Sequence, residues 1–95
     1  MIKVKAKIKL FKGDQKRKTP FTDGYRPLFN FIKNMKTSGL IKLLDRTEFY
    51  PGENEIVEIL FLNDDYLGNN FATGRKFNFD EGVETLGEGE IVELL

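Results

Sequence analysis

Residues 2–10 alternate strictly between apolar and charged side chains, and this pattern constrains the fold more than any other feature. The apolar side chains fall at even positions and lysines fall between them: Ile2, Val4, Ala6, Ile8 and Leu10 against Lys3, Lys5, Lys7 and Lys9. A period of two places the two sets on opposite faces of a β-strand. The chain is therefore predicted to begin with a half-buried strand whose outer face carries lysines.

The segments that follow favour short strands separated by turns and loops. Further strands are expected within residues 28–35, 40–44, 47–50, 56–62, 76–80 and 90–95, with turns at residues 37–39, 51–52 and 81–82 and a polar loop at 63–73. A helix over residues 28–44 is the main alternative, because Phe29, Ile32 and Lys36 have partly helical spacing. Gly87 and Gly89 indicate a bulge or a close approach of two backbones. We predict an all-β fold, a small six- to seven-stranded antiparallel β-barrel or a sandwich.

Composition narrows the classes of function. The 95 residues are expected to form a single domain, residues 1–95. The chain has no cysteine and no histidine, which excludes disulfides and thiolate metal sites and removes the commonest general base. We therefore expect no catalytic residues, no metal and no cofactor. No apolar run is long enough for a signal peptide or a membrane span, so a cytoplasmic protein without a membrane partner is expected.

Charge is separated along the chain although the formal net charge is zero. Residues 1–50 hold 13 Lys and Arg against 4 Asp and Glu, whereas residues 51–95 hold 2 against 11. Such a chain either pairs its halves in the fold or displays faces of opposite sign, which would allow head-to-tail self-association.

Several short motifs resemble one known family. They are Thr19-Pro20-Phe21, Gly24-Tyr25-Arg26-Pro27, Tyr50-Pro51-Gly52-Glu53-Asn54, Gly74-Arg75-Lys76-Phe77 and Leu86-Gly87-Glu88-Gly89. Their order and approximate spacing are similar to those of the C-terminal β-barrel, the third domain, of translation elongation factor Tu. The chain resembles that barrel alone, without the GTPase that precedes it. The resemblance implies a β-barrel that acts as a binding module, with a GTPase or another translation component as its protein partner.

The turn at residues 80–84 departs from the family pattern. Asp80 and Glu84 stand where the family typically has arginines. In elongation factor Tu this barrel helps to bind the T-stem of aminoacyl-tRNA, and carboxylates would repel the phosphates that arginines attract. The resemblance therefore predicts the fold more directly than the RNA role.

Four residues are candidates for partner binding. Arg26 offers a planar guanidinium that can hold a carboxylate, and Tyr25 precedes it. In the elongation factor this region lies near the interface with the GTPase domain, although the loop could equally brace the barrel. Tyr66 and Phe71 are the aromatic side chains expected to be exposed on the 66–71 loop.

The basic N-terminal segment supports an alternative function, the binding of RNA, specifically tRNA. Its candidate residues are Lys3, Lys5, Lys7, Lys9, Lys16, Arg17 and Lys18. The other interpretation is that these lysines pair across strands with Glu88, Glu90 and Glu93, because the first and last strands of such a barrel should be neighbours.

Overall fold

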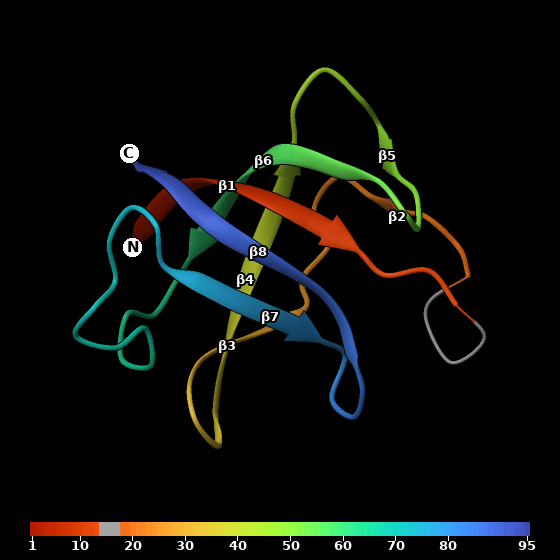
Figure 1. The fold of residues 1–95 in the computed structure, drawn as a ribbon. Coiled ribbons are helices and arrows are strands. Elements are labelled where there is room, and N and C mark those ends of the chain that lie inside the picture. Colours follow the sequence, from red (N-terminus) through yellow and green to blue (C-terminus); the bar gives the residue numbers. More distant parts are fainter. Residues whose placement is uncertain (14–17) are drawn as a thin grey trace.

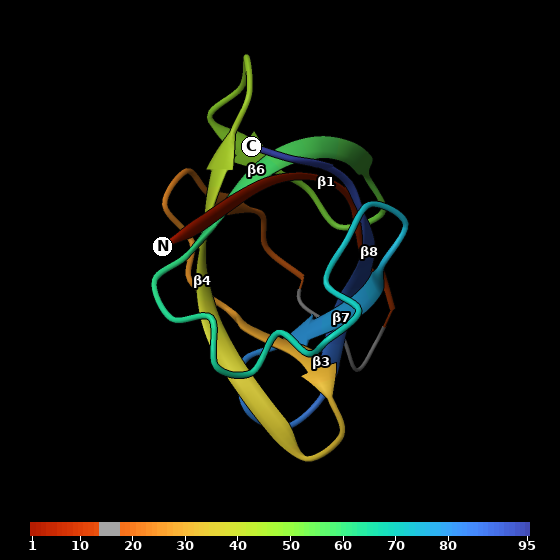
Figure 2. The ribbon, with the colours of Figure 1, turned by 90° about the vertical axis from the view of Figure 1, so that its left-hand side faces the viewer.

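Eight β-strands make up the chain in a computed structural model that describes residues 1–13 and 18–95 (Figure 1). They are β1 (Ile2–Leu10), β2 (Phe21–Thr22), β3 (Leu28–Ile32), β4 (Met35–Leu43), β5 (Glu48–Phe49), β6 (Asn54–Phe61), β7 (Lys76–Asp80) and β8 (Thr85–Leu94). Six of them close an antiparallel barrel in the order β1-β6-β4-β3-β7-β8, and β2 pairs with β5 in a separate sheet. Figure 2, seen from the side of the termini, shows the strands arranged around a ring. The predicted small antiparallel β-barrel is confirmed, and the alternative helix over residues 28–44 is wrong.

The alternating first strand lies between β6 and β8 and closes the barrel. Ile8 is opposite Glu55 on one side and Gly89 on the other. The side chains of Val4, Ala6, Ile8 and Leu10 are fully buried, as the period of two predicted. The prediction that the first and last strands are neighbours is therefore also confirmed.

Phenylalanine rings fill much of the barrel interior. The ring of Phe29 is fully buried, and its centroid lies 5.2 Å from that of Phe61, 5.6 Å from that of Phe77 and 5.9 Å from that of Phe79. Two of these three contacts are edge-on, which is a geometry that aromatic pairs prefer. Phe29 thus joins the β3, β6 and β7 sides of the core.

The turn predicted at residues 37–39 is wrong, because these residues lie inside β4. The chain turns earlier, at Lys33 and Asn34, and Asn34 takes a φ of 65°. Asparagine tolerates this left-handed conformation better than most residues. This position of the strand requires glycine, because a Cβ there would lie 2.9 Å from the rings of both Phe29 and Phe61.

The last strand begins at Thr85 and not near Glu90 as predicted. Gly87 and Gly89 belong to this strand, where they leave room for two core rings. A Cβ on Gly87 would lie 2.3 Å from Phe79 Cζ, and one on Gly89 would lie 2.6 Å from Phe77 Cζ. The predicted close approach is therefore confirmed, and it brings β8 against both the core and the backbone of β1.

Candidate functional site

The loop that carries Tyr25 and Arg26 is held against β4. The backbone of Tyr25 bridges to Ile41, with the Ile41 N–H donating to the Tyr25 carbonyl at 2.8 Å. The Tyr25 ring stacks on Phe21, with centroids 4.5 Å apart, and its hydroxyl donates a hydrogen bond to a Glu81 carboxylate oxygen. Tyr25 is half-buried, so its side chain braces the loop and joins it to the turn after β7.

Arg26 lies at the exposed point of this loop. Its neighbour Pro27 is buried and receives a hydrogen bond from the Gly39 N–H at 3.4 Å. The backbone is therefore tied to β4 on both sides of Arg26, while the guanidinium faces solvent. A backbone that is already fixed loses little conformational entropy when the loop binds a partner.

The other two aromatic candidates differ in their environment. Tyr66 is 42% exposed, which agrees with the expectation for this loop. The expectation that Phe71 is exposed is wrong: it is half-buried, and its ring packs edge-on against Phe31 at 5.2 Å and Phe61 at 5.8 Å. Phe71 therefore extends the aromatic core. The sequence around Tyr66 and Phe71 does not show which of the two rings packs against that core.

The two pairs of candidates do not form one surface. The loop with Tyr66 and Phe71 lies beside both termini, on the left of Figure 1, whereas β2, which precedes Tyr25, lies on the right. Tyr25 contacts Phe21 and Glu81, and Phe71 contacts Phe31 and Phe61.

The lysine row of β1 is flanked by acidic residues on both neighbouring strands. The register places Lys5 opposite Glu93, Lys7 opposite Glu90 and Lys9 opposite Glu88 on β8. On the other side, Lys5 is opposite Glu58 of β6, and Lys3 forms an ion pair with the same carboxylate at 3.6 Å. The positive and negative halves of the chain are therefore interleaved on this face.

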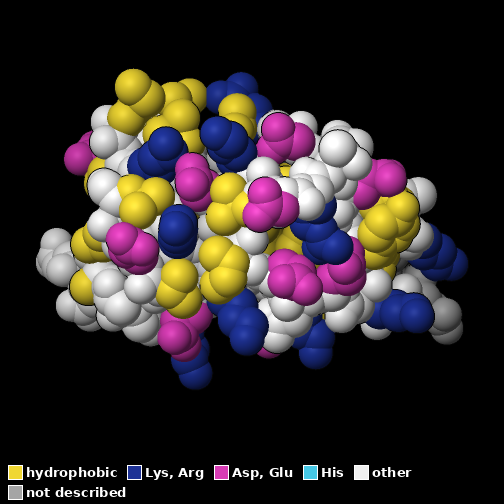
Figure 3. Space-filling view, turned by 90° about the horizontal axis from the view of Figure 1, so that it is seen from above, with side chains coloured by type: hydrophobic (Ala, Val, Ile, Leu, Met, Phe, Trp, Pro, Cys, Tyr) yellow, Lys and Arg dark blue, Asp and Glu magenta, His cyan; other side chains and the backbone are white. Residues whose placement is uncertain are grey.

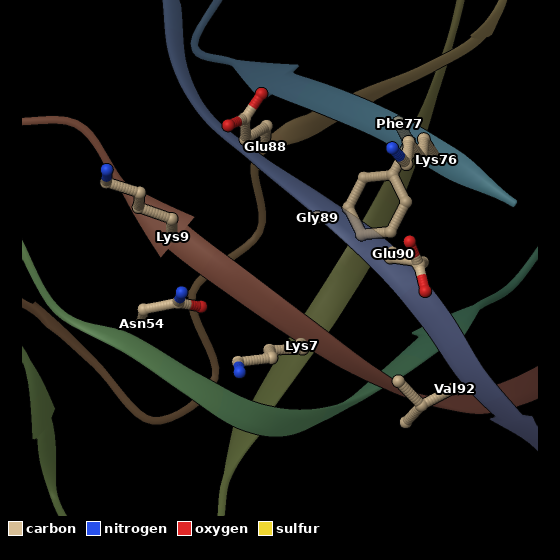
Figure 4. A pocket seen from close by; sticks show the side chains of 9 residues that line it. All are labelled: Lys7, Lys9, Asn54, Lys76, Phe77, Glu88, Gly89, Glu90 and Val92. Carbon is tan, nitrogen blue, oxygen red and sulfur yellow. The ribbon is translucent and has the colours of Figure 1, made fainter. Parts of the chain in front are cut away.

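Charged side chains of both signs also lie close together where the molecule is seen from above. Figure 3 shows Lys and Arg side chains interspersed with Asp and Glu and with hydrophobic side chains. A shallow groove of about 300 Å³ lies over β8 and its neighbours β1 and β7. Figure 4 shows Lys7, Lys9 and Lys76 around it with the carboxylates of Glu88 and Glu90. Such a face has little net charge for attracting a phosphate backbone. Lys18 is exposed, and the candidates Lys16 and Arg17 lie outside the described residues.

A buried carboxylate at the end of β7 was missed by the sequence reasoning, which treated Asp80 as a surface residue of the acidic turn. The Asp80 side chain is only 4% exposed. It accepts hydrogen bonds from Lys36 Nζ at 2.6 Å, Asn30 Nδ2 at 2.8 Å and the Gly82 N–H at 2.7 Å. Burial by itself would raise the pKa of the Asp80 carboxyl, but these three donors together hold that pKa below its usual value of 3.8. Asp80 therefore fastens the turn at 81–84 to β3 and β4, and it is not available to repel RNA.

The lowered pKa of Asp80 makes a pH-dependent contribution to stability. The contribution is fully present above the pKa of the unfolded chain and is lost as the pH falls through the lower folded value. We expect Asp80→Asn to reduce the free energy of unfolding at pH 7 by about 2–3 kcal/mol, because Lys36 loses a buried charged partner. Urea denaturation at pH 7 and at about pH 2.5 should show the difference from wild type shrinking in acid. Glu84→Gln, an exposed change on the same turn, is the control; an equal deficit for Asp80→Asn at both pH values would contradict this account.

Comparison with known families gives no assignment: no family model matches the chain. The resemblance to the elongation factor Tu barrel therefore stays a prediction. Across residues 1–13 and 18–95, no three acidic, cysteine or histidine side chains gather as they would around a metal ion. In that same part of the chain, no helix has the length and apolarity needed to span a bilayer.

Proposed function

We propose that the chain is a non-catalytic protein-binding module resembling the third domain of elongation factor Tu. The observation that supports this function is Arg26, an exposed guanidinium on a backbone that is tied to the barrel on both sides. Arginine is enriched among the residues that dominate protein interfaces, because its planar group can hold a carboxylate through two hydrogen bonds.

The chemistry of this site favours an acidic patch on a protein partner. Tyr25 is engaged with Phe21 and Glu81, so it fixes the position from which Arg26 projects. The resemblance makes a GTPase or another translation component the first class of partner to test. Placement of the protein in the cytoplasm is part of the same proposal.

Arg26→Ala should weaken partner capture about tenfold, which corresponds to about 1.4 kcal/mol. The melting temperature should stay unchanged, because the Arg26 side chain is exposed. The measurement is affinity capture from a lysate of the source cells, with captured GTPases and translation factors quantified by mass spectrometry for each bait.

Two further variants sharpen this test. Lys33→Ala removes an exposed cation from the β3–β4 turn and should capture the same proteins as wild type. Arg26→Lys retains the charge but not the planar fork, so an intermediate loss would identify a carboxylate held by two hydrogen bonds. Unchanged capture by Arg26→Ala would refute the proposed site, and a large fall in its melting temperature would assign Arg26 to the scaffold.

RNA binding remains the second candidate function, and the exposed row of Lys3, Lys7 and Lys9 favours it. Titration of labelled protein with bulk tRNA, followed by fluorescence anisotropy at low and physiological salt, separates the two candidates. Salt-sensitive binding that Lys7→Ala and Lys9→Ala weaken would support RNA recognition. We expect no binding even at low salt, because carboxylates lie opposite these lysines.

A further inference from the structure

The segment between β2 and β3 continues the hydrogen-bond ladder on one side of β4. The pairing of β3 with β4 ends where Leu28 lies opposite Ser38. Beyond that point, three alternate N–H groups of β4 donate to the segment: Gly39 to the Pro27 carbonyl at 3.4 Å, Ile41 to the Tyr25 carbonyl at 2.8 Å and Leu43 to Asp23 Oδ1 at 2.8 Å. Alternate N–H groups of a strand point to the same side, so the three acceptors occupy successive places in one ladder. The last of these acceptors is a side chain.

A tight turn brings this carboxylate to the ladder. The Tyr25 N–H donates to the Thr22 carbonyl at 3.2 Å, which closes a turn over residues 22–25. The third residue of the turn, Gly24, has a φ of 89°, close to the value that a type II turn requires there. Asp23 is therefore held at the second position of the turn, directly after β2, where its carboxylate reaches the end of β4.

The Asp23 carboxylate takes the place of a backbone carbonyl at the end of this ladder. Leu43 is buried, with an exposed fraction of 6%, so its N–H needs an acceptor within the protein. A hydrogen bond from a backbone N–H to a carboxylate is stronger than one between neutral groups. Removal of the carboxylate would leave the two hydrogen bonds that Ile41 makes with Gly24 and Tyr25 to hold the turn against β4.

Arg26 depends on this ladder for its position. It lies between Tyr25 and Pro27, whose carbonyls accept hydrogen bonds from β4. Its side chain is exposed, so the direction in which the guanidinium projects follows from the backbone. We propose that Asp23 is a positioning residue for Arg26: by ending the ladder, its carboxylate keeps the backbone of residues 23–27 in one conformation. This role rests on the function proposed above, because both concern the same site.

NMR relaxation of the isotope-labelled chain tests the positioning without a partner. In wild type the amides of Tyr25 and Arg26 should have order parameters of about 0.85, and Asp23→Ala should lower them to below about 0.6. Hydrogen exchange at the Leu43 N–H should become at least about tenfold faster in the same variant. Asp23→Asn retains an acceptor oxygen and should keep most of the order. Asp64→Ala, which removes an exposed carboxylate from the loop after β6, is the matched control.

Affinity capture then connects the positioning to the function. Asp23→Ala should weaken capture of the same proteins about threefold, because the loop must then become ordered on binding. Circular dichroism confirms that each variant is folded. Wild-type order at Tyr25 and Arg26 in Asp23→Ala would overturn the proposal, as would an equal loss of order in Asp23→Asn. So would wild-type capture by Asp23→Ala where Arg26→Ala is impaired. Unchanged capture by Arg26→Ala would instead refute the proposed function, whatever the relaxation shows.

Discussion

Valine in place of Gly87 should prevent the barrel from closing. A Cβ at this position would lie 2.3 Å from Phe79 Cζ and 2.4 Å from the Lys9 carbonyl oxygen. The ring could move only into a fully buried core, and the carbonyl belongs to the paired backbone of β1. Overpacking usually costs about 1–3 kcal/mol, and a clash with backbone should exceed that range. We therefore expect a loss of more than about 3 kcal/mol in the free energy of unfolding, measured by urea denaturation.

Two neighbouring substitutions act as controls for Gly87→Val. Glu88→Val introduces the same side chain at an exposed position of the same strand, where it should alter stability little. Gly74→Ala tests backbone conformation alone, because Gly74 has a φ of 93° and no atom near its missing Cβ. It should cost about 1 kcal/mol. If Gly87→Val were as stable as Glu88→Val, β8 would have to lie farther from β1 than the structure places it.

Phe29→Ala should be the second severely destabilising change. The ring is fully buried and contacts Phe61, Phe77 and Phe79. Truncation of a buried phenylalanine costs about 3–5 kcal/mol, through the lost transfer free energy and the cavity that remains. A domain of this size has a total stability of about 5–15 kcal/mol. The variant should therefore lose a large share of its stability and melt at a clearly lower temperature than wild type, which thermal denaturation followed by circular dichroism would show.

Phe71→Ala provides the comparison within the same aromatic cluster. This ring is half-buried and contacts the core from one side, so its removal should cost clearly less than the removal of Phe29. Phe29→Leu, which refills most of the volume, should recover much of the loss. Equal losses for Phe71→Ala and Phe29→Ala would show that the loop at 62–75 is as much a part of the core as β3.

The strands were predicted well where one face is buried and the other is solvated. Residues 2–10 and 76–80 alternate clearly, and both segments form strands with those bounds. The prediction failed at residues 37–39 and 85–89, where glycines lie inside strands. Glycine in a sequence indicates a turn, but Gly39 and Gly87 are required here by aromatic rings from other strands. Those rings lie on other strands of the barrel, so the glycines by themselves do not show which ring each one accommodates.

The candidate sites were predictable only in part, for a related reason. The exposure of Arg26 follows from its place in a loop rich in proline and glycine. The burial of Asp80 does not, because it depends on Lys36 and Asn30 lying on the strands beside it. Phe71 and Tyr66 have similar sequence surroundings, yet only Phe71 meets the core rings. The burial and the contacts of these side chains are therefore determined by residues of other strands, which the surrounding sequence does not show.

The position of β1 between β6 and β8 has a consequence for how the protein folds. Val4 pairs with Leu94, so the seam that completes the barrel joins the two ends of the sequence. One edge of β1 therefore stays unpaired during synthesis until the last strand leaves the ribosome. Contacts between such distant residues form slowly. The lysines on the outer face of β1, Lys3 to Lys9, are charged side chains of the kind that discourage an unpaired strand from pairing with other chains.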